Sequence, residues 1–232
     1  MPEHIRAWRS GFVDEPAVVY QEGTRPDYDA LSPLHYRAGP PATVDRIIRA
    51  VDTEHGVLAG VLVTSRPTLN GAWRRPAWGD RFSTGDRSRD AREINAQLRT
   101  ISRVIVDPRF RGLGVGTGLV RCYLGTRSTP CTEALTAMGD VCPFFDRAGM
   151  QPIPMPMQRR HATLMRALGE TDAATAAIAL LQADARATRE QPLRRWASSN
   201  AATRRLAAGP IEAIAAAAAG ALLAPPTAYA HG

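Results

Sequence analysis

The residues best placed to do chemistry lie in one segment, which runs from Ile101 to Gly116. A β-branched run ends at a proline, and Arg111-Gly112-Leu113-Gly114-Val115-Gly116 then leads into an apolar helix start at 117–120. Glycine tolerates positive φ and lets a ligand approach the backbone closely. Consecutive N–H groups at such a turn, together with the positive end of a helix dipole, bind a di-anion. The segment therefore predicts a strand, a phosphate-binding turn and a helix.

The same segment resembles the acyl-CoA loop of the GNAT (GCN5-related N-acetyltransferase) superfamily, in which Arg/Gln-x-x-Gly-x-Gly/Ala follows a strand ending in Val-x-Pro. About 30 residues later, Phe144-Phe145-Asp146-Arg147-Ala148-Gly149-Met150 is similar to a late motif of that superfamily, aromatic-aromatic-x-basic-x-Gly-hydrophobic. The resemblance implies an α/β fold with a mixed central sheet and flanking helices. It also implies acetyl-CoA as the acyl donor.

The resemblance also implies a donor site. Its residues are Ile105, Val106, Arg111, Gly112, Leu113, Gly114, Val115 and Gly116. By resemblance, the N–H groups of the three glycines hold the pyrophosphate, and Arg111 fixes the turn or contacts the phosphates. Backbone groups of Ile105 and Val106 pair with the pantetheine arm, since that strand splays from its neighbour in the family. A Rossmann dinucleotide site does not fit, because the third glycine comes too early and no acidic residue ends a following strand.

The chemistry implied is direct attack of an amine on a thioester. Such a transfer needs a base or a water relay for the amine proton, N–H donors for the oxyanion and often an acid for the leaving thiolate. Many family members carry a tyrosine acid at the position of Phe145 and an asparagine at that of Met138. Both are absent here, so water or another group protonates the thiolate, or the chemistry differs.

Four side chains are candidates for catalysis. His35 and Tyr36 lie in a proline-bounded loop where the superfamily forms part of the acceptor wall, with capping or packing as the alternative role. Glu133 could act as a base, or it could be a solvated carboxylate at a sheet edge. Cys142 could protonate the thiolate or act as a nucleophile, or it could be a buried free cysteine. No spacing of cysteines and histidines predicts a metal site.

A second cluster combines aromatic and basic side chains in the segment 66–85. Its members are Asn70, Trp73, Arg74 and Trp78. Tryptophans interleaved with arginine suit a flat acceptor such as a nucleobase. The alternative is a loop that two tryptophans pin to the core.

The charge, the cysteine count and the apolar runs of the chain indicate its partners and its cellular compartment. The 232 residues carry a net charge of +7 with arginine as their basic residue and no lysine, a bias that a GC-rich coding sequence or an acidic partner could each produce. Three cysteines and a polar start predict reduced thiols in a cytoplasmic protein. The apolar run 214–224 is about half the ~20 residues that a membrane span needs, so no membrane partner is expected.

The pattern along the chain predicts two parts. Residues 1–155 form the acyl-CoA-binding domain, with strands at 44–51, 56–65, 100–107 and 132–138 and helices at 86–98, 117–126 and 143–148. Residues 156–232 form an Ala/Arg-rich helical extension whose last ten residues are expected to be disordered.

Three functions are compatible with these features. The first is an acyl-CoA-dependent N-acyltransferase acting on an unidentified amine, as a monomer or a homodimer. The second rests on a loose resemblance of residues 30–155 to phage Mom-type DNA-modification proteins and ATPase-linked GNAT domains, and implies base modification with nucleic acid as partner. The third is a non-catalytic module whose helices at 158–223 bind a partner.

Overall fold

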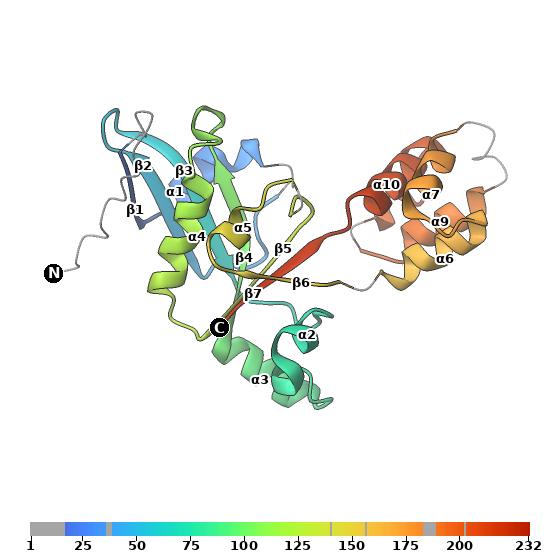
Figure 1. Cartoon of the computed structure of the whole chain (residues 1–232), viewed down its shortest axis with the longest axis horizontal. Helices are drawn as coiled ribbons and strands as arrows, with labels where there is room; N and C mark the ends of the chain where they lie inside the picture. The colour runs from blue at the N-terminus through green and yellow to red at the C-terminus, as the bar shows by residue number, and fades with distance from the viewer. Residues whose placement is uncertain (1–16, 36–38, 140, 156, 183–188, 202) are drawn as a thin grey trace. The chain divides into compact units, whose positions relative to one another are not determined.

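The computed structural model describes residues 17–35, 39–139, 141–155, 157–182, 189–201 and 203–232 (Figure 1). The chain divides into two compact units. The sheet unit comprises Met1–Pro154 together with Thr227–Gly232, and the helical unit comprises Met155–Pro226. In the chain, the helical unit is therefore an insertion before the last strand of the sheet unit.

The sheet unit is built on seven strands in the order β1-β2-β3-β4-β5-β7-β6. Their bounds are β1 Val18–Glu22, β2 Arg46–Asp52, β3 Val57–Ser65, β4 Leu98–Val106, β5 Cys131–Thr136, β6 Gln151–Ile153 and β7 Thr227–His231. Strands β4 and β5 run parallel, whereas the other neighbours are antiparallel. The fold is thus α/β with a mixed central sheet, as the sequence predicts.

Helices cover both faces of this sheet. They are α1 Arg25–Leu31, α2 Arg74–Trp78, α3 Arg87–Gln97, α4 Val115–Thr126 and α5 Phe144–Arg147, with short 3-10 turns η1 Ser32–Leu34, η2 Gly79–Phe82 and η3 Pro108–Phe110. Successive side chains of a strand point to opposite faces. Leu62 therefore joins the core under α4, while its neighbours Val61 and Val63 join the core under α1.

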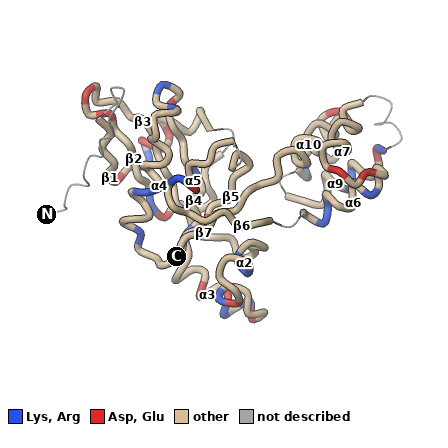
Figure 2. The backbone as a smooth tube through the Cα atoms, in the orientation of Figure 1, with Lys and Arg blue, Asp and Glu red and all other residues tan. Residues whose placement is uncertain are grey.

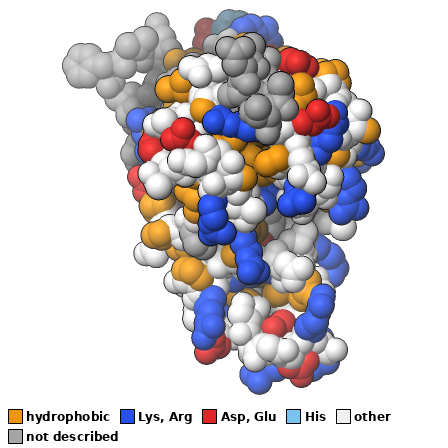
Figure 3. Space-filling view, turned by 90° about the vertical axis from the view of Figure 1, so that its right-hand side faces the viewer, with side chains coloured by type: hydrophobic (Ala, Val, Ile, Leu, Met, Phe, Trp, Pro, Cys, Tyr) orange, Lys and Arg blue, Asp and Glu red, His pale blue; other side chains and the backbone are white. Residues whose placement is uncertain are grey.

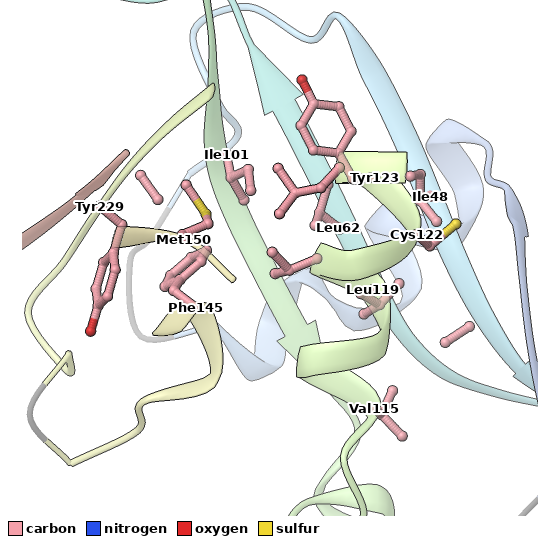
Figure 4. Packing of buried hydrophobic residues seen from close by; sticks show 14 of the residues in the cluster. Ile48, Leu62, Ile101, Val115, Leu119, Cys122, Tyr123, Phe145, Met150 and Tyr229 are labelled. Carbon is pink, nitrogen blue, oxygen red and sulfur yellow. The ribbon is translucent and has the colours of Figure 1, made fainter. Parts of the chain in front are cut away.

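The core under α4 positions the start of that helix. Val115, Leu119 and Tyr123 recur every four residues, which places them on one helix face (Figure 4). They belong to the same buried cluster as Ile48 and Leu62 of the sheet. Because this face is fully packed, the N-terminal end of α4 is held at the end of β4.

The helical unit has a different kind of core. Its helices are α6 Arg159–Leu168, α7 Ala173–Leu181, α9 Glu190–Ser198 and α10 Ile211–Leu223, with a 3-10 turn η4 at Arg204–Leu206. Alanines and a few larger apolar residues fill it: Leu164, Met165, Leu168, Ala176, Ala177, Leu180, Leu193, Trp196, Ala197, Ile214, Ala215, Ala218, Ala219 and Leu222. In the part of the chain that the structure describes, no helix is long and apolar enough to cross a membrane.

The expectation of a disordered end is wrong. Residues 227–231 form β7, which pairs with Thr132–Thr136 of β5 on one side and with Gln151–Ile153 of β6 on the other. Its three central residues, Ala228, Tyr229 and Ala230, are small or aromatic, and all three are buried. A five-residue strand directly after a proline pair gives too short a pattern to recognise in isolation.

Candidate functional site

The glycine loop follows β4 as predicted. Gly112 and Gly114 have φ of +83° and +79°, which favours glycine at both positions. Gly114 is the N-cap of α4, and its carbonyl accepts the N–H of Gly118 at 2.9 Å. The first N–H groups of a helix have no intrahelical acceptor, so those of Val115, Gly116 and Thr117 are available at the start of α4. Together with the helix dipole they form an anion-binding geometry.

Two side chains brace this loop. Asp107 accepts hydrogen bonds from the backbone N–H and the guanidinium of Arg109 at 2.9–3.0 Å, and these bonds lower the pKa of its carboxyl. Arg111 donates from Nε to the carbonyl oxygen of Val106 at 3.3 Å. Arg111 therefore ties the loop to the end of β4, which is the first of the two roles expected for it.

Strands β4 and β5 separate beside this loop. Their ladder ends at the pair Ile101 and Ala134, although β4 continues to Val106. The pairing with β3 shifts at the same place, because Val63 pairs with Arg103 and Thr64 with Ile101. Ser102 is thus an extra residue in β4, and a bulge of this kind bends a strand and ends its pairing. The gap between the strands opens where the bulge lies.

Of the two residues predicted to pair with the pantetheine arm, Ile105 and Val106, only Val106 directs its backbone groups toward this gap. The N–H of Asp107 donates to Ala59 of β3 at 3.0 Å. Because peptide groups alternate sides along a strand, Ile105 also turns its N–H and C=O toward β3, and Val104 and Val106 turn theirs toward the gap. The prediction for Val106 agrees with this geometry, whereas Ile105 is directed to the neighbouring strand.

The loop, the end of β4 and the helix α5 meet at Gly116. A β-carbon built on this glycine would lie 3.7 Å from the ring of Phe144 and 3.8 Å from Cγ2 of Val106. A β-carbon at Gly116 would thus be in ordinary contact with both residues, and a larger side chain would crowd the region between them and the N–H groups at the start of α4.

Phe145 of α5 is buried, and its ring packs at a tilt against two aromatic neighbours. Its ring centroid lies 4.4 Å from that of Phe144 and 5.2 Å from that of Tyr229 (Figure 4). Tyr229 of β7 pairs with Ala134, the residue at which the β4–β5 ladder ends. Its hydroxyl lies 3.5 Å from the carbonyl oxygen of Gly139. Sequence reasoning missed Tyr229 because it lies in the segment expected to be disordered.

Glu133 lies at the centre of a buried network. Arg74 donates to both carboxylate oxygens, from Nε at 2.9 Å and from Nη2 at 2.8 Å. Trp73 Nε1 and Thr100 Oγ1 add hydrogen bonds of 2.7 Å each. Arg74 and Glu133 are each 1% exposed. A buried carboxylate that accepts four hydrogen bonds suits a structural ion pair. Its oxygens are already occupied, which argues against the role of base expected for Glu133.

The cluster of tryptophans and arginine serves the same network. Trp73 is bonded to Glu133, and Nε1 of Trp78 donates to the carbonyl oxygen of Gly232 at 2.8 Å. Nη1 of Arg74 donates to the carbonyl of Leu69 at 2.9 Å. These contacts pin the segment to the sheet, which is the second of the two interpretations of this cluster.

The structure does not bring the remaining candidates together. His35 is half-buried and follows the turn η1, where its N–H donates to the carbonyl of Ser32 at 3.1 Å. Tyr36 lies outside the described residues. Cys142 is exposed rather than buried, and its N–H donates to Met138 O at 2.8 Å. The hydrogen bonds of Glu133 go to Arg74, Trp73 and Thr100, and neither His35 nor Cys142 is among these partners. Those ranges also hold no group of three His, Cys, Asp or Glu side chains that could bind a metal ion.

Comparison with known proteins identifies no family for this chain. No family model matches this sequence, and no curated protein matches it. A crystal structure of a protein named SsHAT is similar to this chain with 16% identity and a TM-score of 0.39, over 61% of this chain and 95% of that one. That likeness is too distant to carry a functional argument. The strand order, the mixed sheet and the helices on its two faces are consistent with a GNAT-like fold.

Proposed function

We propose that this protein is an acyl-CoA-dependent N-acyltransferase whose donor site is the gap between β4 and β5 together with the glycine loop. One observation carries the proposal. The β4–β5 ladder ends at Ile101, and the same strand then leads into a loop with two left-handed glycines at the start of α4. An unpaired strand edge and an anion-binding turn thus follow one another within sixteen residues, Ile101 to Gly116.

Each part of the site has a role in holding a donor such as acetyl-CoA. The N–H groups at Val115 and Gly116 face the pyrophosphate, because a helix N-terminus favours negative charge. Val104 offers its backbone N–H and C=O, and Val106 its N–H, to the amides of the pantetheine arm, because the carbonyl of Val106 already accepts from Arg111. Acetyl-CoA supplies a thioester carbonyl, and a strand N–H at the gap stabilises the oxyanion that develops on attack.

Tyr229 is the proposed acid for the leaving thiolate. It takes the place of the tyrosine that the resemblance places at Phe145, since the two rings are in contact at 5.2 Å between centroids. Tyr229 pairs with Ala134 of β5, which in turn pairs with Ile101 of β4. Tyr229 therefore lies level with the point at which the gap between β4 and β5 opens. Tyr229→Phe removes one oxygen and keeps the ring, so acyl transfer is expected to slow while binding of acetyl-CoA is retained.

His35 remains the proposed base. Histidine is the side chain best suited to act as a general base near neutral pH, which is what removal of a proton from an amine requires. Glu133 is left out of this role because its four hydrogen bonds occupy the carboxylate. His35→Ala should therefore reduce the rate of transfer far more than the affinity for acetyl-CoA.

The alternative of DNA base modification rests on a loose resemblance of residues 30–155. The cluster of Trp73, Arg74 and Trp78 was compatible with a flat acceptor of that kind. These side chains are instead committed to Glu133, Leu69 and the backbone at Gly232. We therefore retain an amine as the acceptor class.

Calorimetric titration with acetyl-CoA tests the donor site. Gly116→Leu would fill the space beside Phe144 and Val106, and it is expected to abolish binding. Gly125→Leu is the matched control, because Gly125 is exposed in the same helix with no neighbour within 4 Å of a β-carbon. Equal affinity of the two variants for acetyl-CoA would overturn the assignment of the loop.

A further inference from the structure

A pocket in the helical unit lies outside the proposed donor site. It has a volume of about 570 Å³ and is formed by α6 and α9 with the residue before α6. Its lining comprises Gln158, Arg159, Arg160, Thr163, Leu164, Ala167, Pro192, Arg195, Trp196 and Ser199. Three of these residues are arginines and none is acidic. Small-molecule sites commonly have volumes of about 300–1,000 Å³.

The arginines of the pocket lack carboxylate partners. In the ranges that the structure describes, no carboxylate lies within ion-pair distance of Arg159, Arg160 or Arg195. The neighbouring Arg194 does have one, since Glu190 accepts its Nε–H at 2.7 Å. The pocket therefore gathers positive charge that the protein itself does not compensate. Arginines are blue and carboxylates red in Figure 2.

Arg160 is held in place rather than free in solvent. Its guanidinium lies 4.7 Å from the centroid of the Trp196 ring. It donates to Gln158 Oε1 and to Thr203 Oγ1, each at 3.1 Å. Burial lowers the pKa of this guanidinium. A cation that is partly desolvated and bonded only to neutral oxygens gains most from an anionic ligand.

The other side of the pocket is apolar. Leu164, Ala167 and Pro192 line it beside the indole of Trp196. Among the described residues, the buried indole Nε1 and the buried Nε2 of His161, whose ring stacks on Trp196, have no hydrogen-bond partner. The pocket thus combines a charged rim, where Arg159 and Arg195 are exposed, with a floor at the buried side chains of Leu164 and Trp196 that suits a ring or a carbon skeleton. Figure 3 shows arginine side chains standing out on the displayed face.

We propose that this pocket binds a phosphate-bearing organic ligand of about nucleotide size. The phosphate would pair with the forked guanidinium groups of Arg159 and Arg195 at the exposed rim, with Arg160 behind them. The organic part would pack on the apolar floor. A free nucleotide and a phosphate of a nucleic-acid strand present the same chemistry, and the experiment separates them.

Calorimetric titration of the full chain with AMP, with inorganic phosphate and with a short oligothymidylate tests this proposal. The double variant Arg159→Ala/Arg195→Ala should bind the preferred probe at least about tenfold more weakly, because it loses two charge-assisted contacts to the phosphate. Arg166→Ala/Arg205→Ala removes the same charge from exposed positions of the unit that do not line the pocket. This control should bind within about twofold of the parent chain.

The probes distinguish a free nucleotide from a nucleic-acid strand as the source of the bound phosphate. Tight binding of AMP indicates a free nucleotide, and binding of the oligothymidylate without AMP indicates a strand backbone. Gly116→Leu should leave either affinity unchanged, which separates this pocket from the donor site. No binding of any probe at millimolar concentration, or an equal loss in the control double variant, would overturn the proposal.

Discussion

The two units of the chain fill their cores in different ways. Under α4, the sheet unit buries large side chains such as Leu62, Leu119 and Tyr123. The helical unit buries alanines where α7 and α10 meet, including Ala177 and Ala218. A buried leucine contributes by its own apolar area, whereas a buried alanine contributes by letting two helices approach closely. One core therefore depends on large residues, and the other depends on the absence of large residues.

Removal of the final strand, β7, should have the largest effect on the stability of the sheet unit. A chain that stops after Pro226 lacks β7, which pairs with both β5 and β6. The ladder bonds of two strands are then lost, so the sheet unit should fail to fold. Loss of cooperative thermal unfolding of that unit, followed by circular dichroism and tryptophan fluorescence, would report this outcome.

Excision of the helical unit is the matched experiment. Ile153 of β6 pairs with Ala228 of β7, so these two positions lie side by side on an antiparallel ladder. A short Gly/Ser linker in place of 155–226 can therefore close a hairpin. The shortened chain should retain a folded sheet unit. An unfolded product would show that the sheet unit depends on the helices.

Breaking the buried ion pair between Arg74 and Glu133 should have the next largest effect on the free energy of unfolding. Glu133→Ala leaves the guanidinium of Arg74 buried without its carboxylate and should destabilise the sheet unit by about 3–5 kcal/mol. Arg75→Ala is a suitable control, because the Arg75–Asp80 pair is exposed and should be worth less than about 1 kcal/mol. Urea unfolding measures both values. A small effect of Glu133→Ala would show that water reaches the site.

Enlarging an alanine tests the core of the helical unit. Ala218 is fully buried, and Ala218→Leu should destabilise this unit by about 1–3 kcal/mol through overpacking. Gly220→Ala in the same helix meets no atom within 4 Å and should stabilise it by about 0.5–1 kcal/mol. Opposite shifts in unfolding midpoint confirm close packing. A neutral Ala218→Leu would indicate an expandable core.

The smallest expected effect is the pH dependence of the stability of the helical unit. Burial, followed by the charge of Arg160, lowers the pKa of His161. The unfolded chain then binds the proton more readily, so the stability of the helical unit should fall as pH drops through the ordinary histidine pKa of about 6.5. His161→Phe should remove this dependence between about pH 7.5 and 5.5. Urea midpoints across that range provide the measurement.

Local patterns could be read from the sequence where a residue type has one structural meaning. The glycines at 112 and 114 predicted a turn, and both adopt positive φ. The apolar run 56–65 predicted a strand and corresponds to β3. The proline and glycine that bracket 143–149 predicted a short helix, which is α5.

Features that depend on residues far apart in the chain could not be read. Glu133 looks like an exposed carboxylate until Arg74, fifty-nine residues earlier, is placed on it. The extra residue Ser102 has no local signal, since a bulge is defined by the partner strand. Tyr229 gained its neighbour Phe145 only through the return of the chain to the sheet.

The position of β7 has a consequence for the order of folding. During synthesis, strands β1 to β6 emerge first, and the slot between β5 and β6 stays empty until residues 227–231 have been made. Seventy-two residues of helical unit, 155–226, are completed in that interval. For that time the unpaired edge of β5 is open to pairing with other chains. Rapid, local folding of the alanine-rich helices would shorten the exposure, because helices form from contacts close in sequence.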